Sequence, residues 1–380
     1  MMNLAASFLF IFLLVHSLQA DCNVASVTKA SGTHLQYSIS KEKLCSGDLI
    51  FEDQFDSFDL SRWQHENTLA GGGNWEFEYY LNNRSNSFVK DGNLHIKPTY
   101  LSDDYGEDFL HSGTLDINGG SPADICTNAG FYGCSRTGSE ANYLNSIKSA
   151  RIRTVESFSF KYGTLEIRAK LPGGDWLWPA FWLLPRYNTY GTWPSSGEID
   201  LMESRGNREM VSSEGVNVGT QQISTTLHWS PSVADNQWSR THFETNNAAG
   251  FDTDFHTYKL VWTSEGMDFY IDDNQIGSVR PPAGGFWELG EFSGRDNPWA
   301  AGTKMAPFDQ EFYILINLAV GGVNGYFSDD ASNPGGKPWS NTSPTASTDF
   351  WKGKSQWEPS WHLGTDDSHL IIDYVRVYAA

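Results

Sequence analysis

Three carboxylates stand among apolar residues in the centre of the sequence: Gly197-Glu198-Ile199-Asp200-Leu201-Met202-Glu203-Ser204. Side chains of a β-strand alternate between two faces, so Glu198 and Asp200 would share one face and Glu203 would fall on the other, apolar face. An unpaired carboxylate buried there is costly. One extra residue at positions 201–202, a β-bulge, would return Glu203 to the side of the other two acids. The spacing therefore predicts a bulged strand with three carboxylates in a row.

The predicted bulge sets the distance between the two glutamates. At about 3.3 Å per residue, the Cα atoms of Glu198 and Glu203 would be roughly 13 Å apart. If the side chains lean toward each other, their carboxyl groups are about 5 Å apart, as in a retaining glycosidase. Asp200 between them would help to keep one carboxyl protonated while the other is ionised. The same string also occurs in solvated acidic strands and loops, so the context must decide.

Tryptophan and proline are frequent just before the acid strand. The sequence there reads Trp178-Pro179-Ala180-Phe181-Trp182-Leu183-Leu184-Pro185 and then Tyr190-Gly191-Thr192-Trp193-Pro194. With these segments the chain resembles glycoside hydrolase family 16, in its laminarinase-like branch. The likeness extends over residues 48–378 and includes an opening signature at 59–63. Residues 124–136 resemble the insertion of invertebrate β-1,3-glucan recognition proteins, also called Gram-negative-bacteria-binding proteins.

The expected fold class is all-β. The 36 Gly, 15 Trp, 16 Tyr and 23 Phe residues suit strands joined by many turns. Residues 164–171 alternate between apolar and charged side chains, 308–322 contain a buried strand, and 370–378 supply the last strand. No segment has helical periodicity over more than a turn or two. The resemblance implies a β-jelly-roll sandwich of two antiparallel sheets, whose concave sheet forms an open substrate cleft.

Residues 99–149 show no strand pattern and are dominated by Gly, Ser, Asp and Asn around two cysteines. We expect a long insertion without periodic structure. Loops of this length are usually functional or mobile. The sequence alone assigns no role to the insertion.

The resemblance implies a role for each acid. Glu198 is expected to be the nucleophile, Glu203 the general acid and then base, and Asp200 the carboxylate between them. The residues expected to contact substrate are Asn74, Arg168, Trp178, Trp182, Trp193 and His228.

Several of these contacts have a purely structural alternative. Trp176, Trp178 and Trp182 share one strand parity, and residues i and i+4 lie about 13 Å apart. That spacing suits two separated glucosyl units, although core packing produces the same stripe. Arg168 stands in an alternating strand, where a charge often serves only as a solvated face, and a lone histidine such as His228 is more often structural than functional.

A structural calcium ion occurs in many members of the family. By resemblance its ligands would be a backbone carbonyl near Gly92 and the carboxylate of Asp373. The chain has Asp53-Gln54 where many relatives have Asp-Glu, which departs from the full calcium site. The resemblance implies no cofactor for the chemistry itself.

The chain is expected to be exported. Residues 1–20 read as a signal peptide with an apolar core at 8–15, followed by an N-terminal arm at 21–45 and a catalytic domain at 46–380. No later apolar run reaches the length of a membrane span. Asn83 and Asn341 begin glycosylation sequons.

Four cysteines in an exported chain indicate disulfides, and four cysteines allow three pairings. We prefer Cys22 with Cys45 and Cys126 with Cys134, because each pair is local in the sequence. Their spacing does not resemble a zinc site.

The formal net charge of −20 and the pI near 4.8 argue against nucleic acid or an anionic membrane as partner, whereas a neutral polysaccharide is not repelled. The resemblance implies a secreted, monomeric, retaining endo-β-1,3-glucanase that acts on laminarin-type glucans in digestion or antimicrobial defence. The alternative is a non-catalytic β-1,3-glucan recognition protein of innate immunity. Such receptors often lack the paired glutamates, and both glutamates are present here, which favours the hydrolase.

Overall fold

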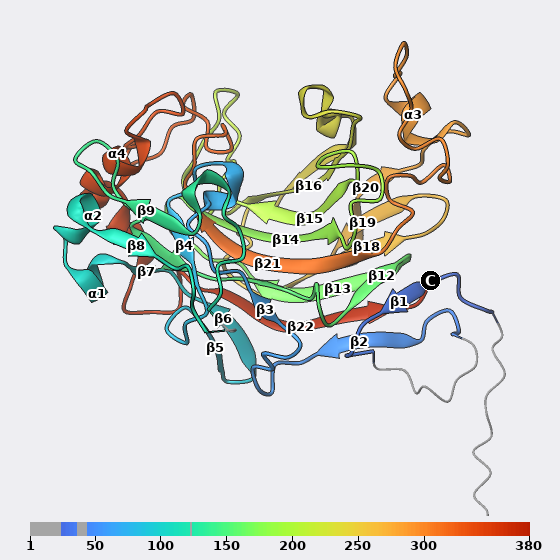
Figure 1. The fold of residues 1–380 in the computed structure, drawn as a ribbon, viewed down its shortest axis with the longest axis horizontal. Helices are drawn as coiled ribbons and strands as arrows, with labels where there is room; N and C mark the ends of the chain where they lie inside the picture. The colour runs from blue at the N-terminus through green and yellow to red at the C-terminus, as the bar shows by residue number, and fades with distance from the viewer. Residues whose placement is uncertain (1–23, 36–43, 122–123) are drawn as a thin grey trace, which may run out of the picture.

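Two large antiparallel sheets dominate the computed structural model, which describes residues 24–35, 44–121 and 124–380 (Figure 1). The first sheet has nine strands. Its main path runs β1 (Lys29–Ser31), β12 (Ser159–Lys161), β21 (Phe312–Val320), β14 (Leu177–Pro185), β15 (Glu198–Ser204), β16 (Gln222–His228) and β17 (His242–Asn246). Beside this path, β11 (Arg151–Arg153) pairs with β21 and with β3 (Gln64–His65). The acid strand is β15, and it lies between β14 and β16.

The second sheet has eight strands. They run β20 (Asn274–Val279), β19 (Met267–Ile271), β18 (His256–Trp262), β13 (Gly163–Lys170), β22 (Leu370–Tyr378), β6 (Asn93–Ile96) and β5 (Ser87–Lys90), with β2 (Leu49–Asp53) also paired to β22. A tight turn joins β5 to β6, and Asp91 and Gly92 there have φ values of 54° and 74°, as a two-residue hairpin requires. The predicted last strand is confirmed as β22.

The core fills the space between the two sheets. Leu165, Ile167 and Ala169 of β13 are buried and alternate with partly exposed charged residues, as predicted. From the first sheet, the Phe181 ring lies 5.5 Å from the Tyr258 ring of the second, and the same 5.5 Å separates Phe312 from Trp262. All nine residues of β21 are buried, which confirms the buried strand predicted within residues 308–322. The all-β sandwich is therefore confirmed.

The insertion at 99–149 is not structureless, which corrects the prediction. It holds β7 (Thr99–Tyr100), α1 (Ser102–Tyr105), α2 (Phe109–Ser112), β8 (Thr114–Asp116), η2 (Gly130–Tyr132), β9 (Ser135–Thr137) and β10 (Ile147–Ser149). The strand β10 pairs in parallel with β4 (Glu78–Tyr80) and antiparallel with β7, while β8 pairs with β9. These elements are too short for a sequence period to reveal them.

The remaining helical elements are short and lie outside the sheets. They are η1 (Gly71–Gly73), η3 (Val233–Asp235), η4 (Trp238–Thr241), α3 (Gly285–Leu289), α4 (Ala346–Lys352), α5 (Lys354–Trp357) and η5 (Glu358–Trp361). Over the described ranges, no helix has the length and apolar character to cross a membrane. The predicted signal peptide lies outside these ranges. Part of the predicted arm forms β1, which extends the first sheet by pairing with β12.

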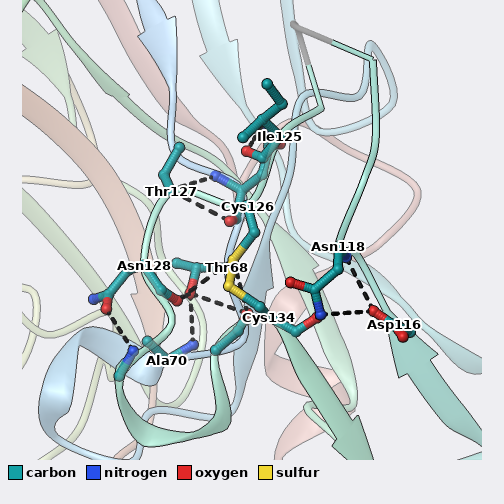
Figure 2. Close-up of a disulfide and its surroundings, with 12 residues drawn as sticks. Thr68, Ala70, Asp116, Asn118, Ile125, Cys126, Thr127, Asn128 and Cys134 are labelled. Carbon is teal, nitrogen blue, oxygen red and sulfur yellow. Dashed lines mark hydrogen bonds between the residues drawn. A yellow bond between two sulfur atoms is a disulfide. The ribbon is translucent and has the colours of Figure 1, made fainter.

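A disulfide joins Cys126 to Cys134, which confirms one predicted pair (Figure 2). Cys45 is also disulfide-bonded, and its predicted partner, Cys22, lies outside the described residues.

Candidate active site

The acid strand carries the predicted bulge. Across β14, Phe181 pairs with Met202 and Trp182 pairs with Asp200, so Leu201 is the extra residue. On the other side, Asp200 pairs with Thr226 and Glu203 with Ser224, which shows the same shift. Leu201 and Met202 are 2% and 0% exposed, so the bulge lets both side chains stay buried. The three acids are thereby free to face the same side, and the prediction is confirmed.

All three acids line one cleft of about 1250 Å³ on the first sheet. Strands β14, β15, β16 and β17 form its floor, and segments 72–74, 127–131, 233–238 and 324–326 contribute to its walls. This volume exceeds the roughly 300–1,000 Å³ of a small-molecule pocket. The cleft therefore has room for several sugar units.

Glu198 is held from two sides. The Trp193 indole Nε1 donates a hydrogen bond to Glu198 Oε2 at 2.8 Å. Directly across the strand pair, His228 Nε2 lies 4.0 Å from Glu198 Oε1. These two contacts fix the orientation of the Glu198 carboxylate.

Asp200 is buried, and its Oδ2 lies 3.2 Å from His228 Nε2. Burial, followed by the charge of Glu198, raises the pKa of Asp200 well above its usual value. For His228, burial opposes the charged form, but the ion pair with Asp200 and the charges of Glu198 and Glu203 outweigh it and raise the pKa to about 10. His228 is therefore a cation at neutral pH, set among three acids.

Glu203 receives a hydrogen bond of 3.0 Å from Trp178 Nε1 to its Oε1. Burial raises the pKa of Glu203 and the charge of Glu198 adds to this, whereas His228 and Trp178 oppose it. Glu203 therefore keeps a proton to higher pH than an ordinary glutamate. A protonated carboxyl beside an ionised one is the pair that acid-assisted glycoside cleavage needs.

The three predicted tryptophans line the cleft. Trp178 stacks on Tyr326 at a centroid distance of 3.9 Å, Trp182 Nε1 donates to Asn317 Oδ1 at 2.7 Å, and Trp193 is 41% exposed. Trp176, which shares the sequence parity of Trp178 and Trp182, instead packs in the core with its ring 5.0 Å from that of Trp339. It precedes β14 and has a φ of 70°, so strand parity does not apply to it.

A charged network that the sequence did not reveal supports Trp182. The Arg151 guanidinium lies 5.1 Å from the Trp182 ring and 4.5 Å from the Tyr80 ring. Arg151 also forms ion pairs of 3.4 Å with Glu66 and 3.8 Å with Glu76. Such cation–π and ionic contacts fix the position of the Trp182 indole. In the sequence, the two glutamates of Glu76-Phe77-Glu78 were only a weak indication of this charged network.

The predicted polar residue Asn74 also lines the cleft. Its Nδ2 donates to Glu76 Oε1 at 2.9 Å, which ties it to the same network. Tyr326, Trp238 and Phe131 line the cleft as well and were not predicted.

Arg168 lies outside the cleft, contrary to its predicted substrate contact. Strand β13 belongs to the second sheet, and Arg168 pairs there with Asp373 of β22 and lies 4.8 Å from the Phe255 ring. The alternation identified the strand but not the sheet that it joins.

The same ion pair bears on the expected calcium ion. Asp373 accepts a hydrogen bond from the Arg168 guanidinium, so a cation already neutralises the carboxylate that calcium would need. Gly92 sits in the β5–β6 turn. The residues in this arrangement do not fit a calcium ion.

Two other groups of side chains bring possible metal ligands within 4.8 Å of one another. One consists of Glu198, Asp200 and His228, where His228 Nε2 already faces the carboxylates. The other consists of His95, Asp366 and His369, where the two Nδ1 atoms lie 3.1 Å apart, as in a direct hydrogen bond.

The two predicted sequons differ in their surroundings. Asn83 Oδ1 accepts a hydrogen bond from the backbone N–H of Ser85. Asn341 Nδ2 donates to the Phe327 carbonyl at 2.9 Å, and its Oδ1 accepts from Lys337 Nζ. The Asn341 amide nitrogen, to which a glycan would be attached, is thus already engaged, so Asn83 is the better candidate.

Comparison with known proteins agrees with this geometry. The family model of glycosyl hydrolases family 16 matches residues 132–284. A β-1,3-glucan-binding protein of Penaeus monodon is 51% identical over 339 residues, which cover 87% of this chain and 90% of the relative. β-1,3-Glucan-binding protein 1 of Galleria mellonella is 37% identical over 88% of this chain, which spans 64% of that relative's length.

Among solved structures, the laminarinase of Rhodothermus marinus is similar in fold. The match has a TM-score of 0.54 at 24% identity and covers 88% of this chain and 97% of the laminarinase. This likeness concerns the fold alone.

Proposed function

The chain belongs to glycosyl hydrolase family 16, and we propose that it is a retaining endo-β-1,3-glucanase that hydrolyses laminarin-type glucans. The observation that carries the proposal is the row of Glu198, Asp200 and Glu203 on one bulged strand inside a long cleft. A binding protein needs no acid held protonated beside an ionised one, whereas a retaining hydrolase does.

In the first step, Glu198 attacks the anomeric carbon while Glu203 donates its proton to the departing glycosidic oxygen. The bond from carbon to that oxygen breaks, and a glycosyl-enzyme ester forms at Glu198. The raised pKa of Glu203 keeps the proton available for this transfer. The indole of Trp193 orients the Glu198 carboxylate, and that of Trp178 orients Glu203.

In the second step, Glu203 is a carboxylate and takes a proton from water. That water attacks the same anomeric carbon, and the ester bond to Glu198 breaks. Two inversions give net retention. The His228 cation offsets the negative charge that accumulates around Glu198 and Asp200.

The shape and lining of the cleft support a neutral polymer as substrate. Trp182 and Trp193 expose aromatic surface in one groove, and aromatic faces pack against the apolar faces of sugar rings. Trp178 is only 7% exposed and lies stacked on Tyr326. The cleft volume of about 1250 Å³ exceeds that of a pocket for one sugar, which supports binding of several units of a long chain and internal cleavage. The names of the two relatives, which describe binding of β-1,3-glucan, favour a β-1,3-linked glucan as the polymer.

Export is part of the proposal. The Cys126–Cys134 disulfide is of the kind that forms in oxidising compartments, which agrees with the signal peptide expected at residues 1–20.

The second candidate function is glucan recognition without cleavage in innate immunity. The names of both relatives, which describe binding rather than hydrolysis, favour it. This chain spans most of the Penaeus relative but about two thirds of the Galleria relative. The two candidates share the cleft and differ only in whether Glu198 and Glu203 turn substrate over.

Reducing-sugar release from laminarin, measured together with laminarin binding, separates the candidates. We expect the purified protein to do both, and to release distinct product series from laminarin, curdlan and barley glucan. Binding without release of reducing sugar would leave only the recognition function. Absence of both would refute either candidate.

Replacing His228 with glutamine is expected to move the alkaline limb of the pH profile of kcat/KM to higher pH. Activity falls as pH rises through the pKa of Glu203, because the acid must be protonated. The His228 cation lowers the pKa of Glu203, so its loss raises that pKa. His228 itself, with a pKa of about 10, stays charged through the neutral range. The measurement is laminarin hydrolysis across pH, and an alkaline limb that stays in place or moves to lower pH would contradict this coupling.

A further inference from the structure

The insertion at 99–149 contributes part of the cleft wall. Thr127, Asn128 and Phe131 from its disulfide loop line the same cleft as the acids, next to Gly73 and Asn74 of the glycine-rich loop. Two segments far apart in the sequence therefore meet at one part of the cleft, and the proposed chemistry uses neither of them.

An exposed aromatic pair stands where these two segments meet. Trp75 is 44% exposed and Phe131 is 48% exposed. Their rings contact edge to face, with centroids 5.5 Å apart and planes at 88°. Large exposed aromatic side chains beside a groove commonly mark a binding surface. Edge-to-face packing leaves ring faces of the pair available to a ligand.

Both aromatic residues have a backbone conformation that side chains with a Cβ rarely adopt. The φ values are 56° for Trp75 and 52° for Phe131. Left-handed geometry at a bulky residue costs free energy and persists only where the surroundings enforce it; it clusters at ligand sites. A loop selected only for stability would carry Gly or Asn at these positions.

The surroundings of the pair enforce this geometry through a dense set of contacts. The Cys126–Cys134 disulfide closes the loop that carries Phe131 (Figure 2). Thr68 Oγ1 donates to the Asn128 carbonyl at 2.8 Å and accepts the Ala70 N–H at 3.1 Å, so it ties the loop to the segment before the glycines.

Arg136 completes the support. Its guanidinium donates to the Phe131 carbonyl at 2.6 Å and lies 5.7 Å from the Trp75 ring. It also donates to Asn145 Oδ1, and Asn145 Nδ2 donates to the Glu78 carbonyl at 2.6 Å. One arginine thus links both aromatic residues, through Asn145, to β4.

We infer that Trp75 and Phe131 form a stacking subsite for an additional glucosyl unit of a β-1,3-glucan chain that also occupies the acid centre. The inference rests on the proposed glucan-binding function of the cleft and assigns the insertion a role, which is to extend the cleft for long chains. The ligand is a neutral glucopyranose ring, whose apolar C–H face packs on an aromatic face while its hydroxyl groups reach the side-chain amides of Asn74 and Asn128.

The test compares how affinity grows with chain length. A β-1,3-linked trisaccharide and an octasaccharide are titrated calorimetrically into the full-length protein carrying Glu198→Gln, which prevents turnover during the measurement. We expect Trp75→Ala and Phe131→Ala each to lower octasaccharide affinity about five- to tenfold, while trisaccharide affinity stays within about twofold.

Tyr132→Ala is the matched control. Tyr132 follows Phe131, is 71% exposed and shares its left-handed backbone conformation, with a φ of 60°. Its ring is not part of the Trp75–Phe131 pair and does not line the cleft, so both affinities should persist. In a Cys126→Ser, Cys134→Ser double variant the loop is no longer closed by a disulfide. This variant should therefore also lose the increase in affinity from the trisaccharide to the octasaccharide. Melting temperatures of the variants confirm that each is folded.

Two outcomes would overturn the subsite alone: unchanged octasaccharide affinity in both alanine variants, or an equal loss for both chain lengths. If the protein without aromatic substitutions bound neither oligosaccharide, the proposed glucan function itself would fail, and the subsite with it. The two failures are therefore distinguishable.

Discussion

Replacing Glu198 with alanine is expected to lower kcat on laminarin by at least about 10⁴-fold, because the proposed glycosyl-enzyme ester forms on this carboxylate. Asp200 is its neighbour on the same face, but burial and the ion pair with His228 hold it away from a nucleophilic role. Laminarin binding should persist, since the tryptophans remain. Initial rates of reducing-sugar release, with binding measured in parallel, check both statements.

Chemical rescue gives this prediction a sharper form. Azide can enter the space left by the missing carboxylate and attack the anomeric carbon of an aryl β-1,3-gluco-oligosaccharide. We expect the Glu198→Ala variant to yield an α-glycosyl azide, with inverted configuration and the phenolate expelled. A β-glycosyl azide would show that the nucleophile lies elsewhere. Activity equal to that of the unsubstituted protein would refute the assignment outright.

Replacing Glu203 with alanine is expected to lower kcat on laminarin about 10²- to 10⁴-fold, the usual contribution of a general acid. The loss should be much smaller for the first step with an aryl glycoside, because a phenolate leaves without protonation. Azide should then intercept the glycosyl-enzyme and give a β-glycosyl azide, with retained configuration. The measurements are burst kinetics with the aryl substrate and NMR of the azide product.

Glu244→Gln is a matched control for both acid variants. Glu244 lines the same cleft from β17, its side chain is 49% exposed, and its Oε1 lies 3.3 Å from His242 Nε2. It has no role in the proposed steps, so activity should stay within about twofold of the unsubstituted protein.

An equal loss of activity in Glu203→Ala on laminarin and on the aryl glycoside would argue against an acid role for Glu203.

The acid strand could be predicted from the sequence because two physical demands meet in eight residues. Leu201 and Met202 both require burial, and three carboxylates require the opposite face. Only an extra residue satisfies both demands, and the register across β14 and β16 shows it. Likewise, the alternation of β13 and the continuous apolar run of β21 gave those strands directly.

Long-range pairing could not be predicted from local pattern. The alternation around Arg168 is the same whichever sheet receives the strand, and only its register with β18 and β22 places Arg168 outside the cleft. Trp176 fits the tryptophan stripe in sequence, yet a left-handed backbone conformation before β14 turns it into the core.

The residues that support the cleft could not be predicted from the local sequence pattern either. Arg151 of β11 and Glu76, which lies just before β4, are far apart in sequence, so the contacts of Arg151 with Glu76 and with Trp182 form only on folding. The same holds for Trp75 and Phe131, which the disulfide loop brings together. The insertion has many Gly and Asn residues around a cysteine pair. This composition indicated a loop, but it did not indicate that the loop forms part of the cleft wall.

Proton NMR of laminarin hydrolysis, followed from the first seconds, tests the central claim most directly. The anomeric signals of the newly formed reducing ends distinguish the two configurations before mutarotation mixes them. With Glu198 as nucleophile and Glu203 as acid and base, the β-anomer appears first and the α-anomer grows in later. First appearance of the α-anomer, or no new reducing end at all, would contradict the account.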